Sequence, residues 1–349
     1  MNLMRLKSTR AAIAVAATFP LLLMMGACGS TSADAGGAGG GKVYRFQFGV
    51  NDPDGEWDTI AFQKWASDVK KDTGGHVVIN VVTNGALGAN STQLAAIQKA
   101  SQFGYTASEG DLEGLDPLFT LPDLPYMFPK GTAQAKEIMN GEFGDQLNQK
   151  LQDHGLRCVG WISFGPRDII SKVPVKGPAD LKGLKLRVQP SKTMESGYQK
   201  LGADINPIAY NEVFTALSTG VVQAMENAPT QLYAKKIYQV AKNLTLNDMI
   251  YSVGCLMVSD QLFKSLPQQY QDAITKDGEA AASDEFDGFE KANDEAIDNM
   301  KKAGVTIYQG NTAEWQAAVG STAEDFAKSQ GAETYAAYQK IISDEAAGK

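Results

Sequence analysis

Residues 180–229 alternate between strand-like and helix-like patterns, and this alternation restricts the fold more than any other feature of the chain. At 184–188 (LKLRV), apolar and basic residues alternate with a period of two, which is typical of a half-buried strand. A helix-like segment follows around 194–201, and 221–226 has the pattern of the next strand, with Asn227 at its end. In an open α/β sheet, ligands bind beyond the carboxyl ends of the strands. The segment therefore predicts an α/β fold with a polar site at these strand ends.

Arg187 lies in the first of these predicted strands. If Leu184 and Leu186 face a core, Arg187 points to the opposite side, toward water or a cleft. A guanidinium group offers a planar pair of donors that matches a carboxylate through two parallel hydrogen bonds, which a lysine cannot do. The pattern leaves two interpretations open: a carboxylate-binding arginine, or a solvated or salt-bridged surface arginine.

Several long motifs resemble one family of transport proteins. The motifs DLKGLKLRV, LGADINPIAYNEVFTAL and TGVVQAMEN lie within 180–227, and TGGHVVINVVTNGALG and LPDLPYMF precede them. In this order they resemble the solute receptor of tripartite ATP-independent periplasmic (TRAP) transporters, of the DctP type. The resemblance implies an α/β, two-lobe periplasmic-binding-protein-like fold, with a ligand cleft between the lobes and a long helix crossing both. The helix-forming segment 267–302 is the candidate for that helix.

The resemblance also assigns roles to residues of the cleft. Receptors of this type hold a carboxylate with the arginine of the LKLRV motif, which is Arg187 here. Arg167 matches the family's second cleft arginine, Asn227 its cleft amide, and Tyr210 an aromatic position that packs against the ligand. The sequence departs from the family at 223–227, which read QAMEN where DGQEN is common.

Three further residues match polar positions of the opposite lobe, namely Asn51, Ser108 and Glu109. An acidic side chain at such a position would accept hydrogen bonds from ligand hydroxyl groups. The alternative for Glu109 is a solvated carboxylate in an acidic loop spanning 108–113.

The N-terminus reads as an export signal followed by a lipidation site. Residues 1–27 combine three basic residues near the start with an apolar run at 11–25, which is too short to span a bilayer comfortably. The sequence MGAC at 25–28 resembles a bacterial lipobox, in which Cys28 would be acylated and become the mature N-terminus. We therefore expect an extracytoplasmic, lipid-anchored protein, in the periplasm or on the outer face of the cell membrane. The alternative is an ordinary signal peptide with an incidental cysteine.

After the signal peptide, the chain is predicted to form a tether and two lobes. Residues 28–42 are rich in glycine, alanine and serine, as flexible tethers are. The predicted lobes are lobe I, residues 43–164 plus 252–292, and lobe II, residues 165–251 plus 293–349. Recurring strand–helix patterns predict parallel β/α units. A Gly-Pro turn at 165–166 is expected to end a strand and to place Arg167 beyond it.

Composition argues against several other classes of protein. The net charge is −8, and it becomes −11 without the predicted signal peptide, which carries three basic and no acidic residues. No binding of nucleic acid is therefore expected, because nucleic acids favour a basic face. His76 and His154 show no metal-ligand spacing, and no cofactor motif is apparent. Cys158 and Cys255 allow either one disulfide or two buried thiols.

Together these patterns predict a solute-binding lipoprotein and not an enzyme. It would capture a small organic acid, of the sugar-acid or C4-dicarboxylate class, through an arginine–carboxylate clamp. As a monomer, it would deliver the acid to the permease subunits of a TRAP transporter. Two alternatives stay open: a surface adhesion lipoprotein, and a secreted hydrolase with a glycosidase-like carboxylate pair such as Asp54/Asp58 or Glu109/Asp111.

The lipidation site can be tested with the variant Cys28→Ser. Without the thiol there is no acceptor for the lipid, so the protein is expected to move into the soluble extracytoplasmic fraction. Fractionation of cells with a high-salt wash measures this. A variant that stays with the membranes under high salt would contradict the lipobox interpretation.

Overall fold

The computed structural model of this protein describes residues 41–346. The predicted signal peptide (1–27), Cys28 and nearly all of the tether (28–42) lie outside the described residues. Among the helices of residues 41–346, none is both long and apolar enough to cross a membrane.

One mixed sheet runs through the described chain in the order β2-β1-β3-β8-β4-β7-β5-β6, and β9 pairs with β8. The strands are β1 (Tyr44–Gly49), β2 (Val77–Val82), β3 (Gly104–Ser108), β4 (Leu156–Ser171), β5 (Lys185–Val188), β6 (Asp204–Pro207), β7 (Ala224–Asn227), β8 (Asn243–Ser259) and β9 (Thr306–Gln309). Parallel pairs β1–β2, β1–β3, β5–β6 and β5–β7 form both ends of the sheet, as the β/α prediction requires. At the centre, where β8 pairs with β3 and β4, and β4 with β7, the strands are antiparallel and that prediction is wrong.

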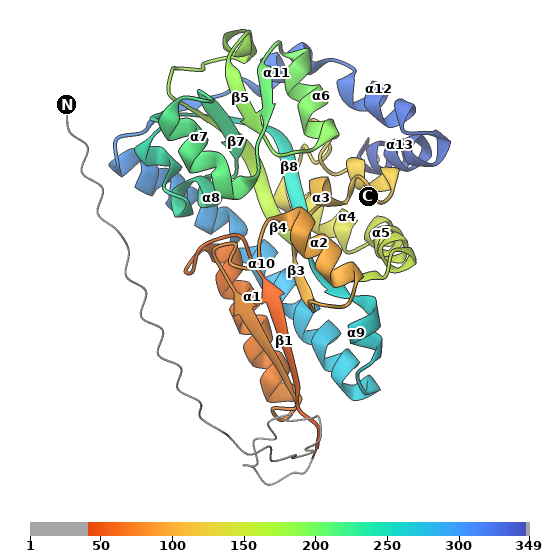
Figure 1. The fold of residues 1–349 in the computed structure, drawn as a ribbon. Helices are drawn as coiled ribbons and strands as arrows, with labels where there is room; N and C mark the ends of the chain where they lie inside the picture. Colours follow the sequence, from red (N-terminus) through yellow and green to blue (C-terminus); the bar gives the residue numbers. More distant parts are fainter. Residues whose placement is uncertain (1–40, 347–349) are drawn as a thin grey trace, which may run out of the picture. The chain divides into compact units, whose positions relative to one another are not determined.

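The two central strands connect two lobes. We call the part built around β1, β2 and β3 lobe I, and the part built around β5, β6 and β7 lobe II. With 16 and 17 residues, β4 and β8 are long enough to run through both parts, as Figure 1 shows. The α/β, two-lobe architecture is therefore confirmed.

Helices cover the sheet. They are α1 (Trp57–Asp72), α2 (Asn90–Gln98), α3 (Glu109–Leu112), α4 (Thr132–Met139), α5 (Glu142–Asp153), α6 (Lys192–Lys200), α7 (Val213–Thr219), α8 (Pro229–Ala234), α9 (Asp260–Lys264), α10 (Gln268–Lys302), α11 (Thr312–Val319), α12 (Thr322–Ser329) and α13 (Ala332–Ala346). Short 3₁₀ turns are η1 (Pro117–Thr120), η2 (Pro178–Leu181), η3 (Tyr210–Glu212) and η4 (Ile237–Gln239).

The long helix α10 crosses both lobes, as predicted. It packs on α1 and α4 in lobe I, on the central strand β4, and on α8 in lobe II (Figure 1). Two glycines permit the close approach to β4. A Cβ atom on Gly278 would lie 2.3 Å from the Val159 carbonyl oxygen, and one on Gly160 would lie 2.6 Å from the Gly278 carbonyl oxygen. Any larger residue at either position would push the helix away from the strand.

Cys158 and Cys255 form a disulfide between β4 and β8, with their Cα atoms 5.7 Å apart. The question that the sequence left open is thereby answered. The bridge closes a sequence separation of 97 residues and ties the two connecting strands together within lobe I.

The expected strand end before Arg167 is wrong, because β4 continues through Gly165 and Pro166 to Ser171. Proline lacks the N–H that a regular ladder uses, and the register with β8 shifts on either side, between Ser163 and Gly165 and again between Arg167 and Ile169. The irregular pairing accommodates the proline. As a result, Arg167 is held inside the central strand.

The expected acidic loop at 108–113 is also wrong. Ser108 ends β3, and residues 109–112 form the helical turn α3. The Asp111 side chain accepts bonds from the backbone N–H and the hydroxyl of Ser108, both at 3.1 Å, which fixes the start of the turn.

The predicted lobe boundaries remain a prediction. Side chains from the last two helices, Ala327 and Ile341, belong to the same buried cluster as Tyr105 and Leu118.

Candidate ligand-binding cleft

A cavity lies where strands of both lobes end. It is lined by Asn51, Asp52, Asn90, Thr106, Ser108, Phe164, Arg167, Arg187, Gln189, Tyr210, Asn227 and Gln231. Ser108 and Asn227 are the last residues of β3 and β7, and Gln189 directly follows β5. The cavity therefore lies at carboxyl ends of strands, where open α/β sheets bind ligands. Six of the seven residues that the sequence singled out meet here.

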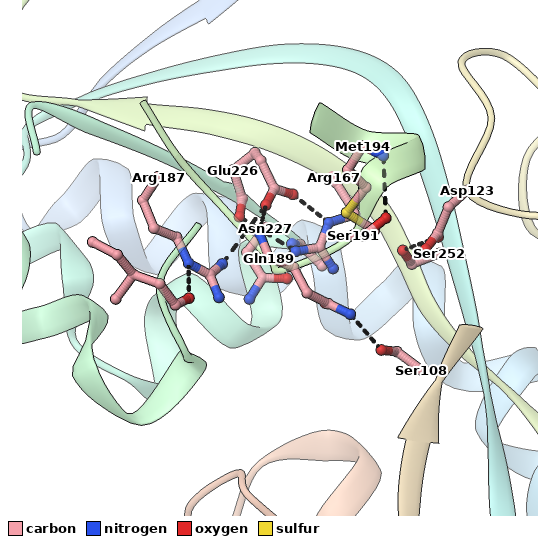
Figure 2. A network of polar contacts seen from close by, with 12 residues as sticks. Ser108, Asp123, Arg167, Arg187, Gln189, Ser191, Met194, Glu226, Asn227 and Ser252 are labelled. Carbon is pink, nitrogen blue, oxygen red and sulfur yellow. Dashed lines mark hydrogen bonds and ion pairs between the residues drawn. The ribbon is translucent and has the colours of Figure 1, made fainter. Parts of the chain in front are cut away.

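Two buried arginines flank one buried glutamate (Figure 2). Glu226, on β7, accepts a hydrogen bond at Oε2 from Nε of Arg167, on β4. Its Oε1 lies 3.6 Å from Nη1 of Arg187, on β5, and accepts a bond from the backbone N–H of Gln189. Together the three ionisable side chains carry two positive charges and one negative charge. A single anionic group on a ligand would balance the remaining positive charge.

Among the described residues, the guanidinium group of Arg187 donates a hydrogen bond only through Nε. Its side chain is 1% exposed, and its Nε donates to the carbonyl oxygen of Ile208 at 2.8 Å, which fixes the orientation of the guanidinium plane. Nη1 is buried and has no hydrogen-bond partner among residues 41–346. Burial lowers the pKa of Arg187 to about 10, partly opposed by Glu226. The side chain thus stays cationic at neutral pH, and it is neither solvated nor fully paired.

Asn227 and Tyr210 complete the lobe II side of the cavity. The carbonyl oxygen of the Asn227 side chain accepts from the N–H of Ala228 at 2.9 Å, so the amide nitrogen is the group left for a ligand oxygen. The ring of Tyr210 lies 4.7 Å from Nζ of Lys235, and its buried hydroxyl makes no hydrogen bond to the described residues.

On the lobe I side, hydrogen bonds run from Asp111 to the cavity wall. Asp111 Oδ2 accepts from Nδ2 of Asn90 at 2.7 Å and from Ser108. Oδ1 of Asn90 accepts in turn from Nδ2 of Asn51, whose own Oδ1 accepts from Gln93 at 3.2 Å. Because a carboxylate only accepts, Asp111 determines the direction of every bond in this relay.

Glu109 does not lie in the cavity wall, so the expected contact between this side chain and a ligand does not match its position. The alternative of a solvated loop carboxylate is wrong, because Glu109 is 0% exposed. Neither carboxylate oxygen has a hydrogen-bond partner in the part of the chain that the structure describes. Burial, and after it the charge of Asp123, raises the pKa of Glu109 well above its usual range.

The lobes touch across the cavity. Nε2 of Gln189 donates to the Ser108 hydroxyl at 2.6 Å, as Figure 2 shows, and Nζ of Lys235 donates to the carbonyl oxygen of Asn51 at 3.3 Å. Nearby, Glu113 accepts from the backbone N–H groups of Lys192 and Thr193 at the start of α6, at 2.9 and 3.3 Å. These contacts hold the two sides of the cavity together.

Sequence reasoning did not include several residues of the cavity wall among the ligand-binding residues, namely Asp52, Asn90 and Gln189. Gln189 follows a predicted strand directly, and that position is a usable signal. Asn90 has no such signal, because only the fold brings it beside Asp111.

The variant Glu226→Gln is expected to destabilise the protein by about 3–5 kcal/mol, because it leaves two buried guanidinium groups without a counter-charge. Urea unfolding measures the loss of unfolding free energy. The exposed Glu212→Gln, on η3 of the same lobe, serves as the control and should change little. A loss below about 1 kcal/mol for Glu226→Gln would show that the arginines do not depend on this carboxylate.

Comparison with known proteins agrees with this architecture. The family described as bacterial extracellular solute-binding protein, family 7 (DctP), matches residues 48–330. The C4-dicarboxylate-binding periplasmic protein DctP of Rhodobacter capsulatus is 31% identical over 290 residues, which cover 80% of this chain and 86% of the relative.

Two solved structures are similar over nearly their whole length. The sugar acid binding protein DctPAm from Advenella mimigardefordensis strain DPN7T, in complex with galactonate, is 26% identical with a TM-score of 0.83, covering 87% of this chain and 99% of that chain. A TRAP periplasmic solute binding protein from Citrobacter koseri, with bound D-glucuronate, is 27% identical with a TM-score of 0.80, covering 86% and 99%. The chain therefore belongs to family 7 of the bacterial extracellular solute-binding proteins, the DctP-type receptors of TRAP transporters.

Proposed function

We propose that this receptor captures a small organic acid, of the sugar-acid or C4-dicarboxylate class, through a clamp of two arginines on its carboxylate. The observation that carries the proposal is the pair of buried guanidinium groups that share one glutamate at the edge of a cavity. A buried cation with an unpaired donor is a strong site for a carboxylate, because the desolvated hydrogen bond is charge-assisted.

The names of similar proteins support an acid as the ligand. The relative from Rhodobacter capsulatus is named for C4-dicarboxylates, and the two structures hold galactonate and D-glucuronate. All of these ligands carry a carboxylate, although they differ in the rest of the molecule. A carboxylate clamp is the feature that would serve every one of them.

In the proposed complex, the guanidinium group of Arg187 donates to the ligand carboxylate, and Arg167 and the amide nitrogen of Asn227 assist. Tyr210 packs against the carbon skeleton, and Asn51 and Ser108 face the ligand from lobe I. Glu109 lies behind the wall and does not touch the ligand.

Closure of the lobes would bend the two central strands. The register shift in β4 beside Arg167 and the left-handed backbone of Asp248 in β8 (φ 45°) lie at the crossing between the lobes and are the proposed hinge. Closure would desolvate the carboxylate and strengthen its bonds to the arginines.

The family is extracytoplasmic and consists of binding proteins. Beyond that, we propose that acylated Cys28 anchors this chain, that it acts as a monomer, and that the closed form docks on TRAP permease subunits. Neither alternative from the sequence is favoured. Asp58, one member of the suggested glycosidase pair, is absent from the residues that line the cavity.

The variant Arg187→Ala is expected to weaken binding of the cognate acid by roughly 30-fold to several-thousand-fold, because it leaves a desolvated carboxylate unpaired. Arg187→Lys should recover little, since an ammonium group cannot form two parallel bonds. Arg167→Ala should weaken binding less than Arg187→Ala, because in this proposal Arg167 only assists Arg187. Lys185→Ala, an exposed neighbour on the same strand, is the matched control.

Calorimetric titration of galactonate, D-glucuronate and succinate into each variant measures these effects, with melting curves to confirm folding. Affinities within about threefold of the unmodified protein for both Arg187 variants would place the carboxylate elsewhere.

Delivery to the permease can be tested by transport. Vesicles that carry the permease and this receptor should accumulate the acid when an ion gradient is applied and should not respond to ATP, because the family works with ion-coupled permeases. Vesicles given Arg187→Ala receptor are the control and should take up little. Uptake driven by ATP alone would contradict the assignment to this class of transporter.

A further inference from the structure

The wall opposite the arginines carries a carboxyl group that the clamp does not use. Asp52, two residues beyond the end of β1, lines the cavity from lobe I and is 5% exposed. Its Oδ1 is buried and has no hydrogen bond within 3.5 Å among residues 41–346, and the nearby Tyr210 hydroxyl, which lowers the pKa of Asp52, is the donor that faces it. A buried acceptor on a cavity wall is suited to a hydroxyl group of a ligand.

Other carboxyl groups lie directly behind Asp52. Glu56 accepts from the N–H of Asp58 at 2.9 Å at the start of α1, and Glu285 of α10 accepts from the N–H of Ser163 at 2.7 Å. All four acidic side chains are at most 6% exposed. Burial, and after it the Asp58 carboxylate, raises the pKa of Asp52 to about 8, and burial raises that of Glu56 to about 7. The group therefore already holds protons near neutral pH.

Lys235 is the cation that faces this group. Its ammonium donates to the carbonyl oxygen of Asn51 and lies over the Tyr210 ring, and burial lowers its pKa. One ammonium cannot balance four carboxyl groups together with a further anion. A second ligand carboxylate at this end would add a negative charge beside these buried carboxyl groups, and it could bind only while they stay protonated.

Three polar side chains of the lobe I wall each use a donor within the protein. The amide nitrogen of Asn90 donates to Asp111, and that of Asn51 donates to Asn90. The Ser108 hydroxyl donates to Asp111 and accepts from Gln189. A ligand that reaches this wall meets the Asp52 carboxyl group and the Thr106 hydroxyl, both of which can pair with ligand hydroxyl groups.

We propose that Asp52 is the specificity-determining residue of the cleft, which accepts a hydrogen bond from a ligand hydroxyl and disfavours a second carboxylate. The inference rests on the proposed function, because it takes the first carboxylate to be held by Arg187. It selects polyhydroxy monocarboxylates of the sugar-acid class over C4-dicarboxylates.

The test compares galactonate and D-gluconate with succinate and malate in calorimetric titrations of the full mature protein. The unmodified protein should bind at least one of the two polyhydroxy acids tenfold or more tightly than either dicarboxylate. Asp52→Asn, which keeps the shape but replaces one carboxyl oxygen with an amide NH2 group, should weaken the polyhydroxy acid roughly 10- to 100-fold. Binding of the dicarboxylates should be unchanged or tighter.

Asp54→Asn is the matched control, since Asp54 is an exposed carboxylate two residues away that accepts from Gln63 at 3.2 Å. It should leave all four affinities unchanged. Melting curves show whether Asp52→Asn is folded. The ratio of polyhydroxy-acid affinity to dicarboxylate affinity in the unmodified protein tests the selectivity without any variant.

Two results would overturn the inference while the proposed function stands. One is a preference of the unmodified protein for a dicarboxylate that still depends on Arg187. The other is a folded Asp52→Asn variant whose ratio of polyhydroxy-acid affinity to dicarboxylate affinity stays within threefold of the ratio in the unmodified protein. If the unmodified protein binds none of the four acids, the proposed function and this inference both fail.

Discussion

The buried contact of Arg167, Glu226 and Arg187 is the interaction on which the cleft depends. Two guanidinium groups would repel each other at this depth, and Glu226 allows both to stay charged. It balances only one of them, and of the described residues only the buried Asp123, whose pKa burial raises to about 7, adds an acidic group nearby, so the site stays attractive to an anion. This explains how a chain with a net charge of −8 can offer a site for an anion.

The sheet places these three residues together. Arg167 comes from a central strand that belongs to both lobes, whereas Arg187 and Glu226 come from parallel strands of lobe II. The proline and the register shifts in β4 hold Arg167 at the crossing and also make that point the natural place to bend. Gly160 and Gly278 let α10 lie directly on the same strand, so the helix supports both lobes close to the cleft. In the proposed function, binding and closure thus use the same short region of the fold.

Much of the lobe II side could be predicted from the sequence. The period-two pattern around Arg187, the position of Asn227 at a strand end and the long helix at 267–302 all depend on local alternation or on extended motifs, which a sequence displays directly. The lobe I side was harder. Asn51 and Ser108 were found by resemblance, whereas Asp52 and Asn90 were missed and Glu109 was placed in the wrong environment. Their roles follow from burial and from neighbours far along the chain.

By itself, the sequence determined the α/β class, the two-lobe family, the long helix and most of the polar residues at the strand ends, because these follow from periodicity and motifs within short segments. Only the tertiary structure decided that Cys158 and Cys255 are bonded, that β4 runs on through Pro166, and that Glu226 lies between two arginines. It also decided that Asp52 lines the cavity and that three buried carboxyl groups lie behind it. These features depend on contacts between residues separated by tens to hundreds of positions, and on the loss of water around charged groups. A local sequence pattern shows neither these long-range contacts nor this loss of water.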